Sequence, residues 1–369
     1  MTMQIDPQLR SDISKIAVIT ISFVLINLFF SLYNDSLLTS GYVTGTTASY
    51  NATSVWIINV LTGVLAGILG GTALVKVNGS YFRRKSFNYA MRATFLMYVL
   101  VYLVVLLSGT LVSAYSKIGS AITFNDYLSE LLFFSFSKMA LVFFVFWCVI
   151  TILTLFFLQI NDKFGPGMFF KFLAGKYYQP REEDRIFMFL DLKSSTTIAE
   201  KIGNKQYFNL LNDVFTDITN SILRSGGQIY QYVGDEVVIS WELSKGLDQA
   251  NCIQCFTRIK DKLLTRSNYY QQMYGVNPEF KAGLHHGEVT AGEIGSIKRD
   301  IVYSGDVLNT TSRIQEQCKN YQVDFLISTD TLNALAAELP YEAIPLGDIA
   351  LRGKKNAVKL NTLVFEKIK

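Results

Sequence analysis

Residues 186–196 read Ile-Phe-Met-Phe-Leu-Asp-Leu-Lys-Ser-Ser-Thr. Five consecutive apolar residues are typical of a central strand that is covered on both faces. Asp191 ends this run, and the hydroxyl side chains of Ser194, Ser195 and Thr196 can cap a short helix that follows. We therefore predict a buried strand, then a carboxylate at its end, then the beginning of a helix.

Strand and helix patterns alternate through the rest of the C-terminal half. The expected elements are a helix ending before Gly226, strands at 228–233 and 237–241, a helix at about 248–274, a strand at 280–284, an extended pair at 288–304, a helix at 306–320, a strand at 323–328, a helix at 329–338 and a strand at 358–366. This alternation predicts a single α/β sandwich domain.

The N-terminal half has a different composition. Of the 34 basic and 30 acidic residues, 9 and 5 lie in residues 1–160, which leaves 25 of each sign for the remainder. Four apolar runs, near 14–33, 54–75, 93–113 and 138–160, are each long enough to cross a bilayer. We predict a four-helix transmembrane domain at 1–160, a membrane-proximal linker at 161–184 and the α/β domain at 185–369.

Loop charges predict the orientation of these spans. Five basic residues lie in 76–92, with Lys76 and Arg92 as the first and last of them, whereas loop 34–53 carries none. The positive-inside rule then puts both termini and the α/β domain in the cytoplasm of a multi-pass inner-membrane protein. A cleaved signal peptide does not fit the first run, because that run is long and no small-residue cleavage site follows it.

The span interiors carry no ionisable side chain, which argues against transport. Small and amide residues in the spans instead suit close helix packing, and they are Asn27, Asn59, Gly63, Gly67, Gly70 and Gly71. Tethering, dimer contact and detection of a lipid, an apolar signal or a membrane partner all remain open.

Two carboxylates stand where chemistry can occur. Asp191 ends the central strand, and Asp235 lies in the tight turn between the strands at 228–233 and 237–241. If these strands pair, both carboxylates emerge at one edge of the sheet and, with the Leu192 carbonyl, suit divalent cations such as Mg²⁺. The backbone N–H groups at Ser194–Thr196 open a helix and can cradle phosphates. The combination indicates phosphoryl or nucleotidyl transfer.

A further pair lies on the helix expected at 306–320. Asn309 and Arg313 are four residues apart and therefore share one helix face. Together they present a neutral and a cationic donor, which is what the developing charge of a pentavalent phosphate requires.

Four segments together resemble the class III nucleotidyl cyclases, the adenylate and guanylate cyclases. In that family's order and spacing they are Phe189-Leu-Asp-Leu-Lys-Ser-Ser-Thr196, Tyr232-Val-Gly-Asp-Glu236, Ala282-Gly-Leu-His-His-Gly-Glu288 and Gly305-Asp-Val-Leu-Asn-Thr-Thr-Ser-Arg313. The resemblance covers about residues 184–366. It implies a ferredoxin-like α/β cyclase domain that converts a nucleoside triphosphate, by family preference ATP, into a 3′,5′-cyclic nucleotide and pyrophosphate.

The resemblance also implies roles for individual residues. Asp191 and Asp235 would hold two Mg²⁺ or Mn²⁺ ions per active site, Asn309 would orient the ribose, and Arg313 would stabilise charge on the α-phosphate. Metal ligands and the Asn/Arg pair come from opposite subunits in this family, so the chain is expected to form a homodimer with two equivalent sites.

Further substrate contacts follow from the same resemblance. Lys354 matches a triphosphate-binding lysine, and Lys281 stands where the family often has an arginine near the phosphates. Three positions depart from the family pattern. Gln231 and Val302 stand at the base-reading positions, and Ser195 replaces a phenylalanine. GTP or a pyrimidine triphosphate therefore stays open, as does a cyclase-like module that senses nucleotide without catalysis.

Other features indicate no additional chemistry. The neutral C-terminal half shows no basic stripe, so a nucleic acid polymer is not an expected partner. We predict structural roles for His285 and His286. Cys252 and Cys255 are predicted to be buried on a helix, and four scattered cysteines do not make a disulfide framework.

Overall fold

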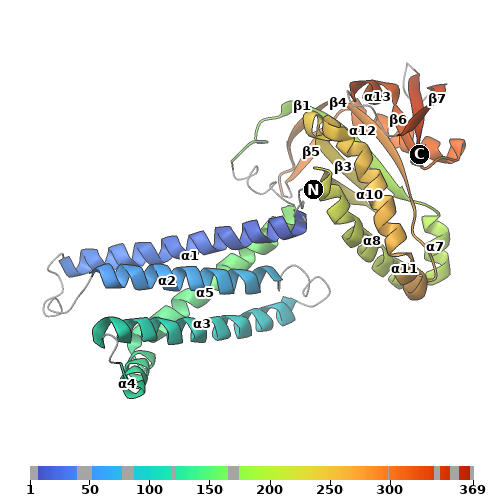
Figure 1. Ribbon diagram of the computed structural model, residues 1–369. Coiled ribbons are helices and arrows are strands. Elements are labelled where there is room, and N and C mark those ends of the chain that lie inside the picture. Colours follow the sequence, from blue (N-terminus) through green and yellow to red (C-terminus); the bar gives the residue numbers. More distant parts are fainter. Residues whose placement is uncertain are drawn as a thin grey trace. The chain divides into compact units, whose positions relative to one another are not determined.

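The computed structural model describes residues 7–39, 52–76, 87–118, 122–164, 174–297, 299–335, 341–349 and 357–365 (Figure 1). The chain divides into two compact units, Met1–Phe164 and Gly165–Lys369. Each unit is described by itself below.

Helices make up the described part of the first unit. They are α1 (Pro7–Thr39), α2 (Ala52–Lys76), α3 (Phe87–Ile118), α4 (Phe124–Ser135) and α5 (Lys138–Phe164). All but α4 are long and apolar enough to cross a membrane, which confirms the four predicted spans. The short helix α4 was not predicted. It begins with a capping box, in which Thr123 and Asp126 each accept a hydrogen bond from the other's backbone.

Polar contacts in this unit lie at the helix ends and between helices. The Lys15 ammonium of α1 lies 2.8 Å from the Asp162 carboxylate of α5. The beginning of α1 and the end of α5 therefore lie at the same end of the bundle, as four antiparallel crossings require. Asn59 of α2 donates to Ser31 of α1 at 2.8 Å.

Glycines bring α1 and α2 together, as the sequence indicated. A Cβ atom at Gly67 would lie 2.5 Å from the Cα atom of Thr20, and one at Gly63 would lie 3.2 Å from the Cα atom of Val24. These contacts are possible only because glycine lacks a side chain. Gly70 differs, because a Cβ atom there would meet nothing closer than the Phe23 ring at 3.8 Å.

The second unit is built on one mixed sheet. Its strands are β1 (Arg181–Leu192), β2 (Gln228–Val233), β3 (Glu236–Glu242), β4 (Phe280–Ile294), β5 (Asp300–Ser304), β6 (Phe325–Ser328), β7 (Glu342–Ile349) and β8 (Val358–Val364). The strand order is β2-β3-β1-β4-β6-β8-β7, with β5 paired to β4. The predicted central strand is thus confirmed, because β1 lies between β3 and β4.

Helices cover both faces of this sheet. They are α7 (Ser195–Ile202), α8 (Asn204–Arg224), α9 (Leu243–Leu247), α10 (Asn251–Thr265), α11 (Ser267–Tyr274), α12 (Asp306–Tyr321) and α13 (Thr329–Ala334), with a 3₁₀ turn η4 (Asp248–Ala250). Ile186, Met188 and Leu190 of β1 pack with α8 and α10 in the main core. Phe187 and Phe189 face the other way, into a second apolar cluster that Val307 of α12 joins. Alternating side chains of one strand therefore serve two cores.

Three elements differ from the expectation. The helix expected at 248–274 is divided near Arg266 into α10 and α11. Strand β4 continues through Gly287, where the side chain of Val307 occupies the space that a Cβ atom would need. Strand β7 was missed because Pro345 and Gly347, which flank a register shift, interrupt its strand pattern.

Gly283 of β4 sets the distance between the sheet and α12. A Cβ atom there would lie 2.5 Å from the backbone nitrogen of Gln315. Gly283→Ala is therefore expected to push α12 outward and to lower the free energy of unfolding by about 1–3 kcal/mol, as overpacking of a core does. Urea denaturation of the full chain, followed by circular dichroism, measures this loss.

Gly292→Ala is the matched control on the same strand. Its Cβ atom would lie 3.4 Å from the nearest atom, in Pro180, which is ordinary contact. Equal stability of the two variants would contradict the close approach of α12 at Gly283.

Candidate active site

The pairing of β1 with β3 brings the two candidate carboxylates together. Asp191 is the register partner of Glu236, and Asp235 directly precedes Glu236 in the turn. Gly234 makes this turn possible, because its φ of +63° is one that L side chains rarely adopt. Asp191 and Asp235 therefore stand at the same edge of the sheet, as expected if the strands pair.

Asp191 already has two partners in the chain. The Lys281 ammonium lies 3.0 Å from Asp191 Oδ2, and the Gln315 side-chain amide donates to the same oxygen at 3.2 Å. Lys281 is also the register partner of Asp191 on β4. The candidate phosphate-binding lysine and the candidate metal ligand are thus adjacent side chains on neighbouring strands.

Glu236 is a member of this cluster that sequence reasoning missed. Burial, together with the negative charges of Asp191, Asp235 and Glu316, raises the pKa of Glu236 to about 7, against the opposing effect of Lys281. The signal was present in the sequence, since Glu236 directly follows Asp235. The cluster therefore holds more negative charge than Lys281 neutralises, which is an arrangement that attracts cations.

Tyr207 of α8 closes another side of the cluster. Burial, and then the negative charge of Asp235, raises the pKa of its phenol, and Tyr207 also hydrogen-bonds Ser195. Its position links the carboxylates to the beginning of α7.

The donor set fits a hard divalent cation. Within the described residues, no three His, Cys, Asp or Glu side chains converge as a metal site. Two carboxylates and the backbone carbonyl of Leu192 still supply oxygen ligands, and an ion of this kind usually completes its shell with water and substrate phosphate. The ammonium of Lys281 shows that Asp191 is placed to contact a cation.

The beginning of α7 has the backbone expected of a phosphate cradle, but it is not capped as predicted. Ser194 is the N-cap and adopts a left-handed conformation, with φ 54°, and its hydroxyl makes no capping bond. The first bond of this helix runs from the Ile198 amide to the Ser194 carbonyl. The amides of Ser195 and Thr196 therefore have no acceptor within their own helix.

Asn309 and Arg313 lie on a different side of α12 from the carboxylate cluster. Gln315 is buried and points to Asp191, whereas Asn309 is exposed. At 100° per residue, Asn309 and Arg313 are turned about 120° and 160° away from Gln315 around the helix axis. A single chain therefore does not bring the pair to its own Asp191.

The remaining candidate positions are spread over the domain. Gln231 is exposed on β2 and Val302 is half-buried on β5. Their neighbours Tyr230 and Tyr303 contact each other, with ring centroids 4.9 Å apart. Lys354 lies outside the described residues.

The residues that were expected to be structural are so placed. His285 Nδ1 lies 2.7 Å from the Ser328 hydroxyl, and His286 Nδ1 lies 3.0 Å from that of Thr331. Cys252 and Cys255 are buried in α10, and burial raises the pKa of the Cys252 thiol to about 12.

Comparison with known proteins places this domain among nucleotide cyclases. The family described as "Adenylate and Guanylate cyclase catalytic domain" matches residues 177–364. "Adenylate cyclase 2" of Rhizobium meliloti (strain 1021) is 35% identical over 200 residues, which cover 54% of this chain and 55% of that protein. An adenylate cyclase of Anabaena cylindrica is 23% identical over 210 residues, which cover 54% of this chain and 41% of that protein.

Solved structures have the same fold. The structure of a bacterial light-regulated adenylyl cyclase matches with a TM-score of 0.52 and 20% identity, over 62% of this chain and 66% of that one. The chain spans about half the length of the first curated relative that it matches. The residues matched by the family include the strand edge at which Asp191 and Asp235 lie.

Proposed function

The chain belongs to the class III adenylate and guanylate cyclase family, and we propose that it is a membrane-bound adenylate cyclase. In this proposal it converts ATP into 3′,5′-cyclic AMP and pyrophosphate at two equivalent sites of a homodimer. One observation carries the proposal, which is the register that places Asp191 beside Asp235, next to the beginning of α7.

Two Mg²⁺ or Mn²⁺ ions would be held by Asp191, Asp235 and the Leu192 carbonyl. When bound, such ions lower the pKa of the attacking hydroxyl and neutralise the charge of the triphosphate. The residues of this chain then have defined tasks. The Ser195 and Thr196 amides donate to phosphate oxygens, and Lys281, released from Asp191, supplies a cation for the triphosphate.

The partner subunit would complete each site. Because Asn309 and Arg313 turn away from their own carboxylate cluster, they are available to another chain across a two-fold axis. Asn309 would hold the ribose so that its 3′-hydroxyl faces the α-phosphate. Arg313 would donate to the α-phosphate oxygens as negative charge develops there, and Lys354 would contact the triphosphate.

We place this cyclase domain in the cytoplasm. The basic residues between Lys76 and Arg92 support that orientation, since positive loops stay on the cytoplasmic side. The Lys15–Asp162 contact also supports it, because this contact puts the beginning of α1 and the end of α5 at the same end of the helix bundle. ATP is available in that compartment.

A product assay tests the proposal directly. We expect full-length protein in nanodiscs, with Mn²⁺ and one of ATP, GTP, UTP or CTP, to release pyrophosphate and cyclic AMP with ATP as the preferred substrate. Mass spectrometry identifies the product, and chelation of the metal is expected to stop its formation.

Other outcomes have clear meanings. A dominant cyclic GMP or cyclic pyrimidine product would contradict the ATP assignment. It would indicate that Gln231 and Val302, at the base-reading positions, select a different base. Metal-dependent nucleotide binding without pyrophosphate from any of the four substrates would contradict catalysis and favour a nucleotide-sensing module.

A further inference from the structure

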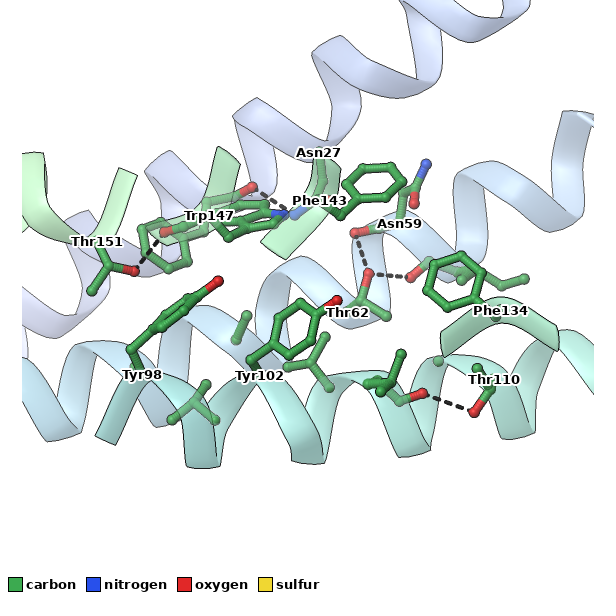
Figure 2. A pocket seen from close by; sticks show the side chains of 18 of the residues that line it. Asn27, Asn59, Thr62, Tyr98, Tyr102, Thr110, Phe134, Phe143, Trp147 and Thr151 are labelled. Carbon is green, nitrogen blue, oxygen red and sulfur yellow. Dashed lines mark hydrogen bonds between the residues drawn. The ribbon is translucent and has the colours of Figure 1, made fainter. Parts of the chain in front are cut away.

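The membrane unit contains a cavity of about 300 Å³ between its helices. Stripes of α2 and α3 line it, together with residues of α1, α4 and α5 (Figure 2). This volume is in the range of small-molecule sites, and it is twice that of a 150 Å³ cavity that binds benzene. The space therefore corresponds to a molecule of about twelve non-hydrogen atoms.

The cavity lies along the seam between α2 and α3, where α2 also packs against α1 and α3 also contacts α5. Gly63 and Gly67 hold α2 tightly against α1. On the other side, the hydroxyls of Tyr98 and Tyr102 of α3 donate to carbonyls of α5, at Phe144 and Ala140 respectively. Phe23 of α1 and Trp147 of α5 join the two pairs, with ring centroids 5.0 Å apart, and both side chains line the cavity.

Small residues keep this seam open where larger ones would fill it. Gly70 of α2 and Gly109 of α3 both line the cavity. Cβ atoms at these positions would meet their nearest neighbours at 3.8 Å and 3.4 Å, which is ordinary contact. Close helix packing therefore does not require glycine at Gly70, in contrast to Gly67.

Thr94 is the second, independent observation. It lines the cavity, the residue is 5% exposed, and among the described residues its hydroxyl has no hydrogen-bond partner. Other threonines that line the cavity donate back to their own helix, as Thr62 does to the Ile58 carbonyl and Thr110 to the Leu106 carbonyl. A buried, unpaired hydroxyl is costly, and a bound ligand removes that cost.

The polar groups of the wall indicate what the ligand carries. Thr62, Thr110, Tyr98 and Tyr102 have each given their only hydroxyl hydrogen to a backbone carbonyl. Their oxygen atoms can therefore only accept from a ligand. The rest of the wall is mostly apolar, with Trp147 and Phe143 among its aromatic members (Figure 2), and its other polar members are Asn27, Asn59, Ser113 and Glu130.

We propose that this cavity is a binding site for a neutral, largely apolar molecule of about twelve non-hydrogen atoms that carries a hydroxyl group. The hydroxyl bonds Thr94 and donates to the neighbouring oxygens, while the apolar part fills the seam between α2 and α3. This site is separate from the carboxylate cluster of the cyclase domain, and its occupancy does not depend on cyclase activity.

Photolabelling tests the site in the full chain. The probe is a 1-decanol analogue with a diazirine on its chain, applied to protein in phosphatidylcholine nanodiscs, and labelled peptides are found by mass spectrometry. We expect saturable labelling of α2 and α3 residues that line the cavity, with competition by 1-decanol at about three- to tenfold lower concentration than by decane. The methyl ether of the probe should bind about three- to tenfold more weakly, as loss of one hydrogen bond implies.

Two variants and one control sharpen the result. Thr94→Val keeps the shape and should weaken binding by about three- to tenfold. Gly70→Leu should remove saturable labelling, because the leucine fills the cavity without meeting backbone. Thr154→Val is the matched control, since Thr154 of α5 donates to its own helix and does not line the cavity. It should leave labelling unchanged.

Competition experiments with two alcohols also distinguish the source of the ligand. Competition by 1-decanol but not by didecanoylglycerol indicates a free amphiphile, and competition by both indicates that the chain of a lipid alcohol enters. The proposal would be overturned if labelling increased linearly with probe concentration and if Leu103, which faces lipid, were labelled as strongly as the residues that line the cavity. Equal affinity of the native chain and Thr94→Val, with decane competing as well as decanol, would also overturn it.

Discussion

Asp191→Asn is expected to lower cyclase turnover by more than about 100-fold, which exceeds the loss usually seen when a residue supporting a metal ligand is removed. The amide keeps the size of the carboxylate and can still accept from Gln315, so the local packing is preserved. It loses the charge that pairs with Lys281 and would hold a divalent cation. Initial rates of cyclic nucleotide formation at saturating Mn²⁺ and ATP measure the effect.

The variant should remain folded. The Asp191 side chain is 23% exposed, and a partly exposed ion pair contributes at most about 1 kcal/mol to stability. Thermal unfolding of the variant should therefore resemble that of the native chain. Activity and stability are then separated in one protein.

Asp217→Asn provides the matched control. Asp217 of α8 pairs with Arg266 at 3.0 Å and accepts from Tyr270, away from the carboxylate cluster. Its loss should lower stability more than that of Asp191 while leaving turnover of the folded protein unchanged. Retained turnover in Asp191→Asn, or an equal loss in both variants, would contradict the role of Asp191 as a metal ligand.

A mixture of two inactive chains is expected to recover activity. Asp191→Ala removes a metal ligand, and Arg313→Ala removes a phosphate contact that the partner subunit would use. In a mixed dimer, one site combines both defects and the other has neither. Equal co-expression should therefore restore about a quarter of native activity, because half of the dimers are mixed and each has one complete site.

The control for this experiment places both defects on the same side of the site. Asp191→Ala and Asp235→Ala both remove metal ligands, so neither site of their mixed dimer is complete. Tandem purification on two different tags isolates the mixed dimers in each case. Recovery in both mixtures, or in neither although mixed dimers are present, would falsify a site shared between subunits.

Local patterns were enough to predict most of the architecture. The four spans followed from hydropathy, and the central position of β1 followed from five consecutive apolar residues. Both predictions depend only on the side chains of one segment. Apolar side chains avoid water whichever other segment they pack against, so no knowledge of the partner is needed. Strand β7 was missed because Pro345 and Gly347 remove the local pattern, while pairing with β8 still stabilises the strand.

Local sequence patterns predicted only part of the candidate site. Asp191 and Asp235 could be named because each follows or lies within a recognisable strand or turn. The partners of Asp191 could not be named, since Lys281 and Gln315 reach it only through the pairing of β1 with β4 and the packing of α12. The raised pKa of Glu236 likewise depends on charges that the chain brings together from four segments.

The same division holds in the membrane unit. The sequence by itself determined that small residues recur in the spans, and it predicted the same role, close helix packing, for all of them. Only the tertiary structure separated Gly67, where helices touch, from Gly70, which borders a cavity. It also left the hydroxyl of Thr94, a residue of the cavity wall, without a hydrogen-bond partner among the described residues. Helix propensity and hydropathy are properties of one segment, whereas a cavity is the space that several packed segments fail to fill.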